Sequence, residues 1–393
     1  MDRTGNGRLV GRARVRHAAV LLTLVVSIGG LSSVGQGGPM SPPTGPVADT
    51  SADPALKFKT MGQIEPRTAV QSLPASLTAS YVITQSGSYY LTGNIAGEAG
   101  RHGILIAASN VTLDLNGFAL VGITTAGDGI STLDFVRNVR VTNGSVRSWP
   151  GSGINVLGDN SRFDNLRISD CTLAGINTDT SLGTVITDCN ILSCRGGGIY
   201  TGVASIVERN TVMNESTLGT GPGISVADGS TVRANTVRST RSTGIVTGGS
   251  CLVEGNTVSK SAGDGINVGT RTTVQGNSCA ENAGTGIVLN GAGCAALNNT
   301  LTNNAPGSTS NGGIVTSQNN SRIEGNALVG NGQGIRVTGL GNFIARNTAR
   351  ANQTNYTIGN SNAYGPIINV ALLGDFGNNP NGNAIHPWAN YSH

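Results

Sequence analysis

Gly-Ile pairs punctuate most of the chain, and the interval from one pair to the next is 21 to 27 residues. After each pair, apolar and polar residues alternate, as in Ile266–Val268, and a second alternating segment follows at Thr273–Gln275. A period of two is expected of β-strands, and a recurring interval between similar segments indicates a repeat architecture. The eleven pairs begin at Gly103, Gly129, Gly153, Gly175, Gly198, Gly223, Gly244, Gly265, Gly286, Gly313 and Gly334.

The repeat predicts an all-β fold, a right-handed parallel β-helix solenoid of about 12 coils that is capped at both ends. Short runs of Ile and Val are separated by Gly, Asn, Asp and Ser, which favour tight turns. A leucine-rich repeat has a similar length, but it requires Leu at several fixed positions in every turn. We expect an N-terminal cap with the first strands at 62–102, the β-helix at 103–359, and a C-terminal cap or tail at 360–393.

The same period predicts columns of equivalent side chains along the solenoid. The isoleucines of the pairs, from Ile104 to Ile335, form one inward column, and a column of alternating charges points outward as a solvated ladder. Stacked Asn side chains can bind the backbone and one another, so we interpret the two Asn columns as turn chemistry. The charged column contains Glu208, Arg233, Glu254, Gln275 and Glu324; the Asn columns contain Asn210, Asn235, Asn256, Asn277, Asn299, Asn326 and Asn347, and Asn282, Asn304, Asn331 and Asn352.

Two of the six cysteines, Cys171 and Cys189, take the place of the first Asn column in neighbouring coils. We therefore expect these two side chains to stack. A disulfide between them is geometrically feasible, and a pair of buried thiols is the equal alternative. The spacing of the cysteines does not indicate a zinc site.

The first 38 residues have the pattern of an export signal. A basic stretch is followed by the apolar run "AAVLLTLVVSI" at 18–28 and by small residues, so we predict a signal peptide at 1–38 and a flexible linker at 39–61. The apolar run is short for a spanning helix, which leaves an uncleaved anchor as the alternative, and no other segment is expected to cross a membrane. The net charge of +4 comes largely from this region. The remainder lacks the basic stripe that nucleic-acid binding requires.

Two segments near the predicted N-terminal cap carry a family resemblance. The stretch "GQIEPRTAVQSLPASLTASYVITQSGSYYLTGNI" and the later "VTLDLNGF" resemble the opening of secreted bacterial right-handed β-helix repeat proteins of the pectate-lyase-like superfamily. The resemblance covers about residues 62–393. It implies a location outside the cytoplasm, secreted or in the cell envelope, and a polysaccharide or cell-surface glycan as the partner.

Extra residues are concentrated between the first Asn column and the next Gly-Ile pair, at 211–222 and 300–312. Loops that grow on one edge of a solenoid usually mark its working face. In the superfamily that this chain resembles, the glycan groove lies along the strand that follows this loop. The candidate ligand-binding residues on that strand and in the loop before it are Asn155, Asn177, Tyr200 and Trp149. An ordinary exposed strand face is the alternative.

Asp179 is a weak catalytic candidate. The triplet Asn177-Thr178-Asp179 matches the first motif of polygalacturonases, but its phase differs and the other motifs are missing. Glycoside hydrolysis needs two carboxyl groups about 5–9.5 Å apart. Asp128 and Asp264 share a phase but are six coils, or about 30 Å, apart. His102 is interpreted as structural rather than as a general base.

Three classes of function are compatible with these patterns. The chain is a polysaccharide lyase or glycoside hydrolase, a non-catalytic glycan-binding protein, or a structural rod of the cell surface. No metal or cofactor is expected from a motif, although calcium is compatible with the lyase alternative. Two carboxylates and an Arg in one groove would favour the enzyme, whereas an aromatic row would favour binding.

Overall fold

The structure of the protein is a computed structural model that describes residues 65–214, 219–372 and 386–393. The chain divides into two compact units, Met1–Lys59 and Thr60–His393, and the described residues belong to the second. The predicted signal peptide and nearly all of the predicted linker fall in the first unit, outside the described residues, and stay predictions. Within the described ranges, no helix is long and apolar enough to span a membrane.

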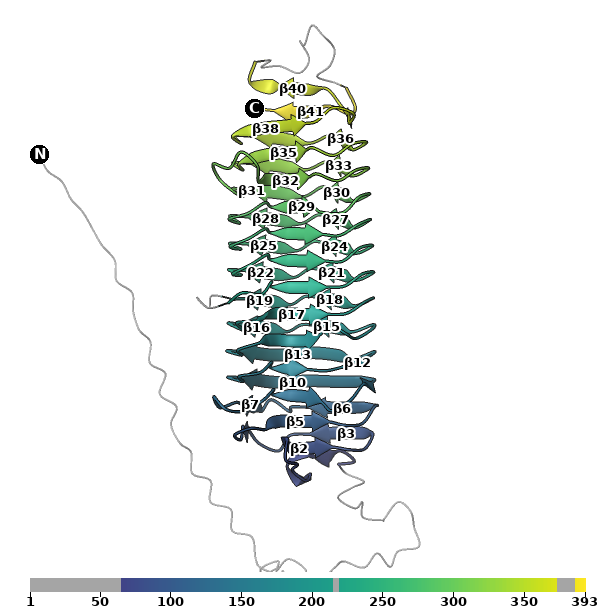
Figure 1. Ribbon diagram of the computed structural model, residues 1–393, viewed down its shortest axis with the longest axis vertical. Helices are drawn as coiled ribbons and strands as arrows, with labels where there is room; N and C mark the ends of the chain where they lie inside the picture. The colour runs from purple at the N-terminus through teal and green to yellow at the C-terminus, as the bar shows by residue number, and fades with distance from the viewer. Residues whose placement is uncertain (1–64, 215–218, 373–385) are drawn as a thin grey trace, which may run out of the picture. The chain divides into compact units, whose positions relative to one another are not determined.

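Parallel strands stacked coil upon coil make up the second unit (Figure 1), so the predicted right-handed parallel β-helix is confirmed. One sheet, which we call the Gly-Ile sheet, takes one strand from each coil. It has 13 strands, close to the expected number of coils. They are β2 (Ala79–Ile83), β5 (His102–Ile106), β8 (Ile130–Thr132), β11 (Ile154–Asn155), β14 (Ala174–Thr178), β17 (Gly197–Thr201), β20 (Ile224–Val226), β23 (Ile245–Thr247), β26 (Ile266–Val268), β29 (Ile287–Leu289), β32 (Gly312–Thr316), β35 (Gln333–Val337) and β38 (Thr354–Ile358).

The second sheet has 26 strands because most coils contribute two short strands to it. Its strands are β1 (Thr68–Ala69), β3 (Gly87–Tyr90), β4 (Ile95–Ala96), β6 (Val111–Asp114), β7 (Ala119–Val121), β10 (Val139–Arg147), β13 (Arg162–Ser169), β15 (Val185–Thr187), β16 (Asn190–Leu192), β18 (Ile206–Glu208), β19 (Thr211–Met213), β21 (Thr231–Arg233), β22 (Thr236–Arg238), β24 (Leu252–Glu254), β25 (Thr257–Ser259), β27 (Thr273–Gln275), β28 (Ser278–Ala280), β30 (Ala295–Leu297), β31 (Thr300–Thr302), β33 (Arg322–Glu324), β34 (Ala327–Val329), β36 (Phe343–Ala345), β37 (Thr348–Arg350), β39 (Ala363–Tyr364), β40 (Ile367–Asn369) and β41 (Asn390–Ser392). In most coils two short strands follow one another in this sheet, but in two coils a single long strand, β10 or β13, takes the place of both. For example, β13 pairs with both β15 and β16 of the next coil. A separate pair is formed by β9 (Val136–Arg137) and β12 (Gly158–Asp159), and two 3-10 turns by η2 (Val70–Ser72) and η3 (Val370–Leu372).

The isoleucines of the Gly-Ile pairs form the predicted inward column. Ile154 is in register with Ile176, which is in register with Ile199, and the column continues in this way through the Gly-Ile sheet. Each of the eleven side chains from Ile104 to Ile335 has no exposed surface. Burial of this column and of the Val residues opposite it supplies the main hydrophobic stabilisation of the coils.

The predicted Asn columns form continuous hydrogen-bonded ladders. In the first ladder, the Asn256 amide donates to Asn277 Oδ1 at 3.0 Å and to the Val232 carbonyl at 2.9 Å, and its backbone N–H also donates to Asn277 Oδ1. The second ladder repeats this arrangement, as between Asn282 and Asn304. Because these amides are buried and bonded within the turns, they serve the fold, as the sequence interpretation stated.

The predicted stacking of Cys171 on Cys189 is wrong. Cys189 begins the first Asn ladder, since its N–H donates to Asn210 Oδ1 at 2.9 Å, and the strand register places Leu166 beside it in the preceding coil. Cys171 is five residues after Leu166, just as Cys194 is five residues after Cys189. The neighbours in adjacent coils are therefore Cys171 and Cys194, whose thiols donate to the carbonyls of Ser169 and Leu192. All six cysteines are free and buried.

The last coils are closed by the C-terminal segment. Asn347 extends the first ladder to Asn390 in β41, which pairs with β37. The Trp388 ring lies edge-on to Phe343 at 5.8 Å between centroids, and the Arg346 guanidinium lies 4.3 Å from the Trp388 centroid. At the other end, β2 already pairs with β5, so the first coil begins within the predicted cap.

Candidate functional site

The outer face of the Gly-Ile sheet places the predicted polar residues in one column. Asn155 in β11 is in register with Ser131 in β8 and with Asn177 in β14, and Asn177 is in register with Tyr200 in β17. Their neighbours along the column are Ser225 and then Val246. Because inward and outward residues alternate along a strand, the buried isoleucines fix this outward set.

Asn177, Asp179 and Tyr200 line a shallow hollow of about 260 Å³ at the edge of this face. The hollow lies over β14 and β17, and its remaining lining residues are Ala174 at the start of β14 and, from the turns before β11, β14 and β17, Ser152, Leu173 and Gly196. Leu173 is exposed and gives the hollow an apolar wall. The structure therefore brings three of the predicted residues together, whereas Asn155 lies one strand away and Trp149 is not among the lining residues.

A buried carboxylate orients the amides of this column. Asp128 Oδ2 accepts hydrogen bonds from Asn155 Nδ2 at 3.1 Å and from the Ser131 hydroxyl at 3.3 Å, while Oδ1 accepts from the Ser152 N–H at 2.7 Å. Asn155 Oδ1 in turn accepts from Asn177 Nδ2 at 3.1 Å. A carboxylate only accepts, so Asn155 must present its NH₂ group to Asp128, and Asn177 must present its NH₂ group to Asn155.

Tyr200 is held in place by its own hydroxyl, which donates to the Gly196 carbonyl at 2.5 Å. A side chain at Gly197 or Gly221 would collide with the ring, because a Cβ there would lie within 2.5 Å of the Tyr200 hydroxyl. Gly197 also has φ +128°, which favours glycine. Burial raises the pKa of Tyr200, so the phenol stays protonated at neutral pH and suits stacking rather than proton abstraction.

Asp179 is exposed just beyond the end of β14 and is the single carboxylate among the seven residues that line the hollow. Hydrolysis with two carboxyl groups therefore has no second partner within this hollow. Among residues 65–214, 219–372 and 386–393, no group of three or more His, Cys, Asp or Glu side chains is arranged to hold a metal ion.

The expectation that Trp149 belongs to the glycan surface is wrong, because its side chain has no exposed area. Its indole N–H donates to the Leu120 carbonyl at 3.3 Å, and a Cβ added at Gly103 would lie 2.9 Å from its ring. Trp149 is three residues after the inward Val146, just as Cys171 is three residues after Ile168. The phase of the repeat thus could have shown that Trp149 fills the interior.

Asp128 was missed as part of the site, and so was its contact with His102. The Asp128 N–H donates to His102 Nδ1 at 2.9 Å, and the carboxylate lies 3.5 Å from the same nitrogen. Both residues directly precede a Gly-Ile pair, 26 positions apart. Two residues that take the same position in neighbouring coils lie side by side, so this position in the repeat predicts the contact although the residues are distant in sequence.

The charged column is present on the other sheet. Glu208 pairs with Arg233 at 2.5 Å, and Gln275 donates to Glu254 at 2.7 Å. Glu324 binds Arg322 and Arg346 instead of its column neighbours. The arginines of these pairs are exposed, but Glu324 is buried and Glu208 is mostly covered, so the predicted solvated ladder holds only in part.

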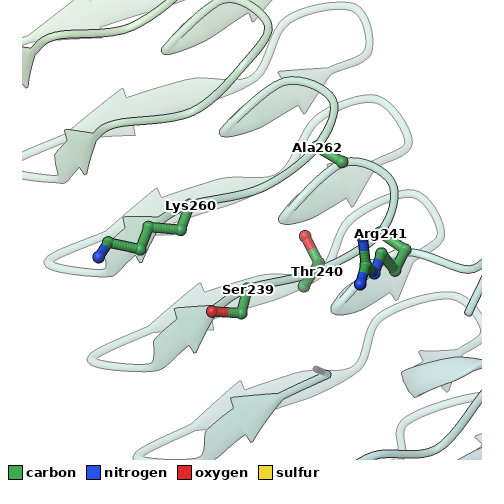
Figure 2. A pocket seen from close by; sticks show the side chains of 5 residues that line it. All are labelled: Ser239, Thr240, Arg241, Lys260 and Ala262. Carbon is green, nitrogen blue, oxygen red and sulfur yellow. The ribbon is translucent and has the colours of Figure 1, made fainter. Parts of the chain in front are cut away.

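A second hollow of about 280 Å³ lies on the turns of later coils and was not predicted. Figure 2 shows Lys260 and Arg241 on opposite sides of Thr240, with Ser239 and Ala262 completing the lining. Lys260 lies 3.5 Å from Glu281. The charged side chains of this second hollow extend from exposed turns. In the first hollow the side chains of Asn177 and Tyr200 are fixed by hydrogen bonds, so the first hollow is the better candidate site.

The family model described as "Right handed beta helix region" matches residues 82–258 and 222–370, which together span well over half of the chain. Among solved structures, the A-module of the mannuronan C-5 epimerase AlgE4 from Azotobacter vinelandii is similar, with a TM-score of 0.59 and 16% identity over 71% of this chain and 91% of that module. The AlgE6 A-module from the same organism has a TM-score of 0.59 and 15% identity over 71% of this chain and 89% of the module. A comparison with curated proteins finds no match.

Proposed function

The chain belongs to the right-handed β-helix family, and from this premise we propose that it binds polysaccharide on the outer face of the Gly-Ile sheet. The observation that carries the proposal is the hollow in which Asn177, Asp179 and Tyr200 converge. A fixed aromatic ring can stack on a sugar, while amide and carboxylate oxygens accept hydrogen bonds from its hydroxyls. The solenoid continues the face on either side, so a polymer can lie across several coils.

Fold similarity supports the ligand class but not an activity. The two similar modules from Azotobacter vinelandii are mannuronan C-5 epimerases, which shows that this fold can serve a protein that acts on a polysaccharide. Binding is favoured over turnover here, because the hollow holds one carboxylate and the Tyr200 hydroxyl is bonded to a backbone carbonyl. Together with the predicted signal peptide, a polysaccharide ligand supports a location outside the cytoplasm.

A glycan array on the full chain, followed by calorimetry with the best ligand, tests the proposal. Tyr200→Ala removes the stacking ring and should weaken binding about tenfold. Val288→Ala is the matched control, because Val288 lies on the same outer column four coils away and is similarly half-buried. Equal affinities for the two variants and the original protein would place binding elsewhere, and turnover of the ligand would favour the enzyme alternative.

A further inference from the structure

The hydrogen-bond chain that starts at Asp128 determines which atom Asn177 offers to a ligand. Asn177 Nδ2 is used by Asn155, whose own amide is oriented by the carboxylate. Asn177 Oδ1 accepts no hydrogen bond within the described part of the chain, so this oxygen is available to a ligand, together with the second N–H of Nδ2. The buried carboxylate therefore acts across two coil boundaries to fix the orientation of the Asn177 amide, and with it the position of the free acceptor oxygen at the hollow.

The other polar atoms of the hollow are also mainly acceptors. Asp179 contributes a carboxylate, and Tyr200 has already committed its hydroxyl hydrogen to Gly196, which leaves only a lone pair. Ser152 offers a hydroxyl, but the residue is almost completely buried. No Lys, Arg or His is among the seven lining residues, and Arg195, although it precedes Gly196, is not one of them.

We infer that this hollow takes neutral, hydroxyl-bearing hexose units and discriminates against uronates, an inference that rests on the proposed function. A sugar hydroxyl donates to Asn177 Oδ1 and to Asp179. A uronate carboxylate would bring further acceptors and a second negative charge beside Asp179, where no lining cation offsets the repulsion. The hollow at Lys260 and Arg241 (Figure 2) has basic lining residues instead, and it provides a control position away from Asp179.

Matched oligosaccharide pairs test this specificity with the full chain. The probes are hexagalacturonate and hexamannuronate, each compared with the same hexasaccharide after chemical reduction of its carboxyl groups, by calorimetry at low ionic strength. Reduction leaves linkage and length unchanged, so it isolates the effect of charge. We expect each reduced form to bind at least about fivefold more tightly than its uronate, which corresponds to two like charges about 4 Å apart that are fully screened by water.

Two variants locate the cause of the preference. Asp179→Asn removes the repelling charge from an exposed position and should reduce the preference for the neutral form to less than about twofold. Lys260→Gln, in the other hollow, should leave that preference unchanged. Tighter binding of the uronates, or a preference that is unaltered in Asp179→Asn, would overturn the inference and leave the proposed function intact. Failure of both members of every pair, and of every glycan on the array, would contradict the proposed function itself.

Discussion

The Asp128 carboxylate and the Asn155 amide are joined by a 3.1 Å hydrogen bond that crosses from one coil to the next. Asp128 is almost completely buried and also accepts from the Ser152 N–H. We expect Asp128→Asn to lower the free energy of unfolding by about 1–3 kcal/mol, because one of the two oxygens that accept from Asn155 and Ser152 is replaced by an NH₂ group, which only donates. Denaturant titration measures this change. Asp179→Asn is the control, and an equal loss in both variants would contradict the structural role of Asp128.

The buried isoleucine column makes a second prediction about stability. Ile266→Ala should lower the free energy of unfolding by about 2–5 kcal/mol, because it empties a site with no exposed surface. Val246→Ala is the matched control, since Val246 points outward from the adjacent strand. Denaturant titration of both variants separates them, and a loss below about half a kcal/mol for Ile266→Ala would contradict inward packing.

The ion pairs of Asp164 predict a loss of stability in acid. Burial alone would raise the pKa of Asp164, but its hydrogen bonds with Arg140, Thr142 and Arg162 bring the pKa below its usual value. A carboxyl group whose pKa is lower in the folded state stabilises the protein above its unfolded pKa, near 4, and this contribution is lost as the pH falls through the folded pKa. Thermal melts between pH 7 and 2 should show that Asp164→Asn removes part of this acid dependence. An unchanged slope would contradict the prediction.

The revised cysteine pairing is tested by oxidation. Oxidised glutathione should join Cys171 to Cys194, because the two residues are neighbours in adjacent coils and the Cys194 thiol lowers the pKa of Cys171, whereas burial raises the pKa of Cys189 to about 12. The Cys171 thiolate therefore forms at lower pH and attacks first. Cleavage before each Asp and after Arg195 separates peptide 170–178 from peptide 188–195, and mass spectrometry detects the link between them.

Single substitutions identify the partner in that cross-link. Cys189→Ser should keep the link between the two peptides, whereas Cys194→Ser should abolish it. The reverse result would restore the pairing of Cys171 with Cys189 that the sequence suggested. Full alkylation of Cys171 after prolonged oxidation would show that the buried pair does not react.

The sequence predicted the fold well because every coil repeats the same inward and outward alternation, which Ile266 and Asn267 illustrate. The errors of the sequence prediction concern which residues in the turn before each Gly-Ile pair point inward. Trp149 and Cys171 both take the interior position three residues after a buried side chain, and because turn lengths vary, this equivalence is seen only by counting from the preceding strand. The orientation of the Asn177 amide was beyond sequence reasoning, because it follows from a hydrogen-bond chain that begins two coils away at Asp128.

That chain of amides also gives the outer face a direction. Every Gly-Ile strand runs the same way, and the hydrogen bonds from Asn177 through Asn155 all point toward Asp128, so the row begins at a buried carboxylate and ends at a free amide oxygen. A polysaccharide is also directional, with chemically different ends. A surface with this polarity distinguishes the two orientations of a linear polymer, so a bound chain would be threaded along the solenoid in one sense only.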